Sequence, residues 1–533
     1  MKQVSTGKGF AYLSIAELLV KLTSVIYIPV LIFILGDFGH GIYVISYEAF
    51  TLIYVLTNEG IQRGIAKLIA ELNAKKNPRD ALRAFKLSRT ILIFGGLLAS
   101  LLLYVMAPYI ANAANSAEAT LSIRALSPTI LITAILSAYR GFFLGKNYIS
   151  QNAFSKLIEQ FVNITISLGA SYIFIKINLE LGVAGATLGT SIGALVAVII
   201  LSKQFYKGRL HKVKRETQDF DSYYYSNKEL IKKLLKYSFP ITLSAGLMSI
   251  GGFIDMFIVN KRLIIAGLTY TTSKVVFSHL SRFRTLLLVP NTISVSLAAV
   301  LLPSLSGAKA IGDENEIKEK IDFAVKMLLL ITIPSFIGFT VLADPIYALL
   351  YPKSGGAELL KFGSITVIFL GFIQIQNVIF QSFSKFYWGV MTMVLGISLK
   401  LFSNFILVSI PSINIYGAVF SHFINYFVPF LLNHYLITKV LGYKMEIIKN
   451  LVVPLISSII MGFVVYILSI GIRSLELRYI YTSILTMGNI IIGAFIFVYC
   501  LLIFGFIKKK EIYDLSPKLY RILPGFIKNK MKN

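Results

Sequence analysis

The sequence has very little cysteine, histidine and charge, and each shortage excludes a class of protein. A single cysteine, Cys500, means that neither an internal disulfide framework nor a cysteine metal site can form. The five histidines are scattered without the spacing of metal ligands. No Walker A sequence occurs, so direct use of ATP is not expected. Redox chemistry and metal catalysis are equally unsupported.

Apolar residues, in contrast, are abundant. They make up 56% of the 533 residues, against 14% charged residues, and no soluble core of this size holds such a balance. Apolar runs of about twenty residues recur along the chain, each long enough to cross a hydrocarbon layer of roughly 30 Å. The sequence therefore predicts an all-α polytopic membrane protein with about fourteen transmembrane helices. We place them at residues 10–35, 41–65, 90–111, 125–145, 153–175, 183–203, 237–260, 276–304, 323–343, 358–382, 389–411, 416–438, 449–472 and 481–507.

Basic residues outnumber acidic ones, 52 to 25, and their placement predicts the topology. The segments 66–89, 203–236 and 508–533 hold 25 of the 52 lysines and arginines. Basic loops of membrane proteins face the cytoplasm and lie against anionic head groups. We therefore expect a membrane protein with both termini in the cytoplasm, in contact with membrane lipids and with no nucleic-acid partner.

The longest polar interruption divides the predicted helices into two groups. Each group reaches its third helix through an amphipathic approach, at 65–68 and at 302–305. Two lobes that start from the same side are typical of parallel repeats with a substrate cavity between them. We predict an N-lobe at 1–203, a basic linker at 204–236, a C-lobe at 237–440, two further helices within 441–507 and a basic tail at 508–533.

Ionisable side chains at membrane depth are the best local indication of function. They are costly in lipid, so they face a wet cavity or one another. The candidate cavity cations, which would bind substrate, are Lys21, Arg63, Arg140, Arg282, Arg284 and Lys400. The candidates for ion coupling or charge pairing are Asp255, Asn404, Glu17 and Glu159. This excess of cations suits a diphosphate head group, because Lys and Arg donate charge-assisted hydrogen bonds to phosphate oxygens.

Structural roles remain open for several of these residues. Glu17 and Lys21 have the helical spacing of an ion pair, as do Lys156 and Glu159. Arg63 and Arg140 lie near the inner ends of their predicted helices, from where a long side chain can snorkel to the interface.

Several stretches of the chain resemble one group of exporters. They are 60–71, 139–145, 254–259, 301–305 and 342–351. They are similar to the stage V sporulation protein B group, a branch of the multidrug/oligosaccharidyl-lipid/polysaccharide exporter superfamily that includes lipid II flippases. The resemblance implies two six-helix lobes plus two helices, which work by alternating access.

The resemblance also implies a function and leaves its details open. It implies a flippase, not an enzyme, for an undecaprenyl-diphosphate-linked sugar, with lipid II or a spore-cortex precursor preferred. Related flippases bind sodium through an acid on the seventh helix, and Asp255 with Asn404 has the residues for such a site. Sodium or proton coupling thus stays open, as does pairing of Asp255 with Arg282 or Arg284.

Three alternatives remain. A polysaccharide repeat-unit exporter and a cation-coupled multidrug exporter would have the same fold. An integral-membrane polymer ligase or acyltransferase would belong to a different class, but no convincing catalytic cluster is present. We expect a monomer without a cofactor, whose partners are a lipid-linked oligosaccharide and the cell-wall synthesis machinery.

Overall fold

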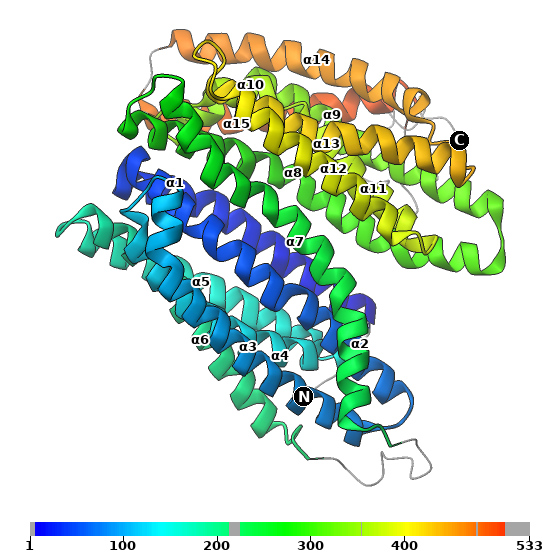
Figure 1. The fold of residues 1–533 in the computed structure, drawn as a ribbon. Helices are drawn as coiled ribbons and strands as arrows, with labels where there is room; N and C mark the ends of the chain where they lie inside the picture. Colours follow the sequence, from blue (N-terminus) through cyan, green and yellow to red (C-terminus); the bar gives the residue numbers. More distant parts are fainter. Residues whose placement is uncertain (1–5, 213–223, 353, 476–477, 507–533) are drawn as a thin grey trace. The chain divides into compact units, whose positions relative to one another are not determined.

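The computed structural model describes residues 6–212, 224–352, 354–475 and 478–506, and every regular element within them is a helix (Figure 1). The predicted all-α fold class is confirmed. The elements are α1 (Thr6–Tyr54), η1 (Val55–Glu59), α2 (Gly60–Ala74), α3 (Pro78–Ala113), α4 (Ala119–Gly145), α5 (Ile149–Phe174), α6 (Leu179–Lys207), α7 (Asn227–Ile265), α8 (Tyr270–Ile311), α9 (Glu314–Leu350), α10 (Ala357–Gly363), α11 (Thr366–Ser382), α12 (Phe386–Leu407), α13 (Ile415–Tyr435), η3 (Leu436–Val440), α14 (Ile447–Ser474) and α15 (Tyr479–Ile503).

The helices account for the predicted membrane spans. Twelve helices in the described residues are long and apolar enough to cross a membrane, or thirteen if α10 and α11, which meet at 54°, form one span. Gly36, with φ 68° and ψ 173°, breaks α1 between the first two predicted spans. Glycine adopts positive φ without a steric penalty. With α1 divided there, each predicted span falls on its own helical stretch, and the chain is a multi-pass membrane protein.

Several helices extend well beyond their apolar runs. α7 begins at Asn227, ten residues before the predicted span, and α3 begins at Pro78 rather than at residue 90. Side-chain caps explain both starts. The Ser226 hydroxyl accepts from the backbone N–H of Glu229, whose carboxylate accepts from the backbone of Ser226 in return. At the start of α3, Oδ1 of Asn77 accepts from the backbone N–H of Asp80.

The chain divides into two compact units. One comprises Met1–Ser281 with Lys400–Ala418, and the other comprises Arg282–Leu399 with Val419–Asn533. Residues 213–223 of the predicted linker and the predicted tail at 508–533 lie outside the described residues.

Small residues bring helices of the first unit close together. A Cβ at Gly189 of α6 would overlap the backbone carbonyl of Asn163 in α5, and one at Gly193 would lie 2.6 Å from the carbonyl of Glu159. A Cβ at Gly141 of α4 would lie 2.8 Å from the carbonyl of Gln62 in α2. Such small-residue contacts are typical of helix packing in membranes.

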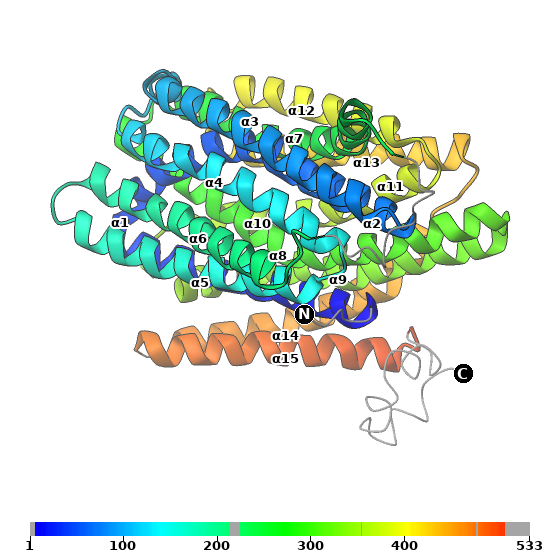
Figure 2. The same cartoon turned by 90° about the horizontal axis from the view of Figure 1, so that it is seen from below.

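Each unit has its own apolar core. In the first unit, aromatic rings of α3, α4 and α6 pack together around Phe85, Phe142 and Phe205. In the second, the core lies among α8, α9, α11 and α13 and includes Phe372 and Phe430. The last two helices, α14 and α15, run side by side within the second unit (Figure 2).

Candidate functional site

Asp255 of α7 is buried in the first unit and binds two side chains of α12. The Lys400 ammonium donates to Oδ2 of Asp255 at 2.7 Å, and Nδ2 of Asn404 donates to Oδ1 at 2.7 Å. Lys400 and Asn404 are four residues apart and therefore share one helix face. The carboxylate is only 2% exposed. We call Asp255, Lys400 and Asn404 the Asp255 site.

Two adjacent glycines of α7 make room at this site. The backbone carbonyl of Gly251 accepts a further hydrogen bond from Nζ of Lys400 at 2.9 Å. A Cβ on the neighbouring Gly252 would overlap the carboxylate of Glu48, which comes from α1. Glu48 therefore brings a second acid to the same stretch of α7. Sequence reasoning missed it, although an acid inside the apolar run 41–65 was the available signal.

Arg140 of α4 forms a second ion pair in the first unit. Its guanidinium donates to Oε2 of Glu159 in α5 at 2.5 Å and to Oγ of Ser155 at 3.3 Å. Arg140 is 7% exposed. The spacing of Lys156 and Glu159 predicted a pair within one helix; the contact of Glu159 with Arg140 of the neighbouring helix was not predicted. Arg140 is thus packed between helices rather than extended to an aqueous interface.

Arg282 of α8 is fully buried in the second unit. Its guanidinium donates to Oγ of Ser354 at 2.5 Å and to the carbonyl of Gly355 at 3.5 Å. The same group lies 4.8 Å from the centre of the Tyr351 ring, within cation–π range. Arg282 therefore binds the segment that follows α9.

The remaining predicted residues lie in other surroundings. Arg63 is exposed on α2 and Arg284 is partly buried on α8. Glu17 and Lys21 lie on α1, but their side chains are outside the described residues. Lys274 was not predicted, because the expected span began at residue 276; it is fully buried in α8 and donates to the carbonyl of Asn115.

The sequence matches one protein family and is similar to two Bacillus subtilis proteins along nearly its whole length. The family model described as polysaccharide biosynthesis protein matches residues 6–309. The lipid II flippase MurJ of Bacillus subtilis (strain 168) is 23% identical over 544 residues, which cover 98% of each chain. Stage V sporulation protein B of the same organism is 26% identical over 507 residues, covering 95% of this chain and 96% of that protein.

A solved structure extends the comparison to the fold. The lipid II flippase MurJ in an inward closed conformation superposes with a TM-score of 0.67 at 17% identity. The match covers 92% of this chain and 98% of that structure. At this level of identity, the superposition shows that the two proteins share a fold.

Proposed function

We propose that this chain, which belongs to the polysaccharide biosynthesis protein family, moves a lipid-linked sugar precursor across the bacterial cytoplasmic membrane. The predicted resemblance to the stage V sporulation protein B and lipid II flippase branch is confirmed by the family match and by two relatives of nearly equal length. The chain is a transporter and not an enzyme of polysaccharide synthesis. The near-complete alignment with a lipid II flippase is the observation that carries the proposal.

The cargo that we propose is an undecaprenyl-diphosphate-linked sugar, with lipid II or a spore-cortex precursor preferred. Its diphosphate needs cationic donors during passage through the membrane. Arg140 and Lys400 each pair with a carboxylate within the membrane. In our proposal these pairs act as contacts between helices, while Arg63, Arg282, Arg284 and Lys21 remain the candidate phosphate ligands.

For the driving force we propose that Asp255 is an ion-pair partner and not a sodium ligand. Lys400 and Asn404 each donate a hydrogen bond to one of its two carboxylate oxygens. Lys400 also donates a hydrogen bond to the carbonyl of Gly251. Sodium would need those oxygens, so Lys400 would have to leave first. An ion drives transport only if its affinity differs between the two conformational states. A proton gradient, the membrane potential or the precursor gradient therefore remains to drive the cycle.

Depletion of the protein in its host tests the cargo. The lipid-linked precursor that the protein carries should accumulate while its polymer product declines, in growing cells for lipid II and in sporulating cells for a cortex precursor. Accumulation of an exopolysaccharide unit instead would favour the repeat-unit exporter. Unchanged pools of all lipid-linked sugars would contradict the proposal.

We further propose that both termini and the basic segments lie in the cytoplasm, and that the protein works as a monomer beside the cell-wall synthesis machinery. The positive-inside rule supports this orientation. A cysteine placed at the exposed Lys228, with Cys500 replaced by serine, should resist a membrane-impermeant thiol reagent in intact cells. Labelling before permeabilisation would contradict the orientation.

A further inference from the structure

A pocket of about 500 Å³ lies where two helix turns of the first unit meet. Asn73 and Lys76 line it from the end of α2 and the turn into α3. Gly145, Lys146 and Asn147 line it from the end of α4 and the turn into α5. Its volume is in the range of small-ligand sites. The first turn belongs to the basic segment 66–89, which the charge pattern predicts to be cytoplasmic.

The backbone explains why the two turns meet. A Cβ at Gly145 would lie 2.7 Å from the carbonyl of Ala66, so only glycine lets α4 approach α2 this closely. Lys76 and Asn147 both have left-handed conformations, with φ of 52° and 60°, and each ends a helix abruptly. The helix α5 begins directly after this pocket, and its N-cap residue, Tyr148, makes no side-chain cap. The positive end of the α5 dipole therefore lies next to Asn147, the last residue of the chain that lines the pocket.

Two lysines, Lys76 and Lys146, line the pocket as hydrogen-bond donors. Nζ of Lys146 donates to Oδ1 of Asn73 at 2.7 Å, which fixes the orientation of the amide. Nδ2 of Asn73 is then left buried, without a hydrogen-bond partner in the described part of the chain. Burial also lowers the pKa of Lys146, so that a bound anion would favour its charged form.

The acids of this region are engaged elsewhere. None of the residues that line the pocket is acidic. Glu71 accepts from Lys233 at 2.8 Å and from the Tyr237 hydroxyl at 2.6 Å. Asp80 accepts from Arg83 at 2.7 Å. The pocket thus has two lysines and no carboxylate among its lining residues.

We propose that this pocket binds a phosphate group, either on the head group of an anionic phospholipid or on a soluble phosphate compound. Phosphate oxygens accept from the ammonium groups of Lys146 and Lys76, and a phosphate group suits the positive end of a helix. Bound phosphate ties the α2–α3 turn to the α4–α5 turn. This inference does not depend on the identity of the cargo.

The full-length protein in phosphatidylcholine nanodiscs tests the site. Binding is measured as the rise in the thermal unfolding midpoint on addition of phosphatidylglycerol, inorganic phosphate or pyrophosphate. The test variant is Lys76→Gln with Lys146→Gln. Its matched control is Lys86→Gln with Lys228→Gln, which removes the same charge from exposed positions outside the pocket.

Wild type and control should show saturable binding, with dissociation constants within about twofold of each other, and the pocket variant should bind at least about tenfold more weakly. A response to phosphatidylglycerol alone identifies a lipid site, and a response to the soluble anions identifies a soluble ligand. Equal loss in both double variants, or no saturable response in wild type, would overturn the proposal. Lys76→Gln alone, at an exposed position, repeats the test if the double variant unfolds without anion.

Discussion

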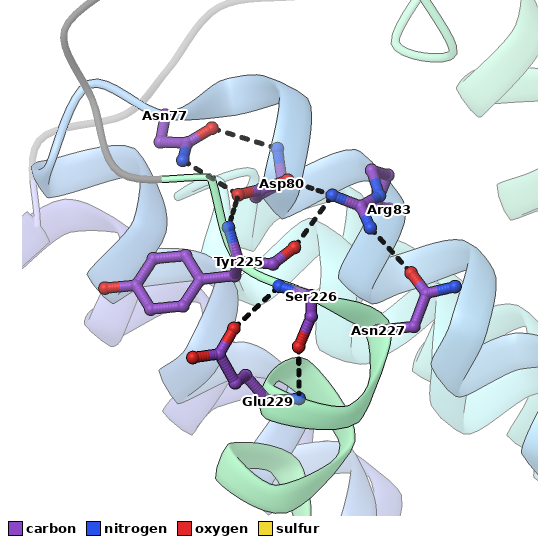
Figure 3. A network of polar contacts seen from close by, with 7 residues as sticks. All are labelled: Asn77, Asp80, Arg83, Tyr225, Ser226, Asn227 and Glu229. Carbon is purple, nitrogen blue, oxygen red and sulfur yellow. Dashed lines mark hydrogen bonds and ion pairs between the residues drawn. The ribbon is translucent and has the colours of Figure 1, made fainter.

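Two buried aspartates lie at different points along α7: Asp80 of α3 contacts the residues at its start, and Asp255 belongs to α7 itself. Near its start, buried Asp80 of α3 accepts from the guanidinium of Arg83 and from the amide of Asn77 (Figure 3). Farther along α7, buried Asp255 accepts from an ammonium and an asparagine amide in the same way. Each acid therefore has one cation and one amide.

The difference lies in where the partners come from and in what surrounds them. Arg83 follows Asp80 by three residues and is 23% exposed, so water can replace it. Arg83 also donates to the Tyr225 carbonyl and to Oδ1 of Asn227, which fixes the start of α7 (Figure 3). Lys400 lies 145 residues from Asp255, and both side chains are 2% exposed. Loss of a partner should therefore matter far more at Asp255 than at Asp80.

The largest effect is expected for Lys400→Ala. The buried carboxylate of Asp255 loses its cation, and the free energy of unfolding should fall by about 3–5 kcal/mol. Thermal and denaturant unfolding in detergent measures the loss. The double variant Lys400→Met with Asp255→Leu removes both charges at similar volume and should recover most of it. A stability of Lys400→Ala equal to wild type would refute the structural role of the pair.

Gly60, at the start of α2, packs against Thr242 of α7, and Gly60→Ala tests that contact. The new Cβ would overlap the backbone nitrogen of Thr242 and lie 2.7 Å from its Cα, so the helices must separate. Overpacking of this kind costs about 1–3 kcal/mol. Gly95→Ala is the matched control, because no atom lies within 4 Å of its added Cβ. Equal unfolding midpoints for the two variants would exclude the close approach.

Arg83→Ala should have a smaller effect, about 1–2 kcal/mol, because Asp80 keeps the Asn77 amide and the backbone N–H of Tyr225. The effect should also shrink in 1 M salt, where the Debye length is about 3 Å, whereas that of Lys400→Ala should not. Unfolding of both variants at low and high salt measures this contrast. The same salt dependence at both sites would remove the distinction between them.

Ser226→Ala should have the smallest effect. It removes the side-chain cap at the start of α7 and should cost about 1 kcal/mol. Hydrogen exchange should rise in the first turn of α7 and stay unchanged around Asp255. Ser226→Asp keeps a cap acceptor and should behave as wild type. Increased exchange along the whole of α7 would show that its two ends are not independent.

The sequence predicted the membrane-embedded part of the fold well and the helix ends poorly. Apolar runs locate the spans because the hydrocarbon layer requires them. Polar residues such as those at 227–236 and 78–89 also form helix, supported by caps at Ser226 and Asn77, and hydropathy does not register them. Gly36 was likewise not identified as the break in α1, although the two predicted spans lie on either side of it.

Individual site residues were easier to predict than their partners. The resemblance placed Asp255 and Asn404 in one candidate site, but Lys400 was named only for its charge at membrane depth, because its contact with Asp255 depends on how α7 and α12 pack. Helical spacing suggested Lys156 as a partner of Glu159, but it could not show that the packing of α4 on α5 brings Arg140 to the same carboxylate. Spacing along one helix carries no information about a neighbouring helix.

Flipping in proteoliposomes is the most direct test of the proposed transport function. The purified protein is reconstituted with a fluorescent undecaprenyl-diphosphate-linked sugar, and the fraction accessible to a membrane-impermeant quencher is followed over time. We predict faster flipping than in protein-free liposomes, at a rate that does not change when a sodium gradient is imposed. A rate equal to that of protein-free liposomes under every gradient would contradict the proposed function, and a rate that requires sodium would contradict the role assigned to Lys400.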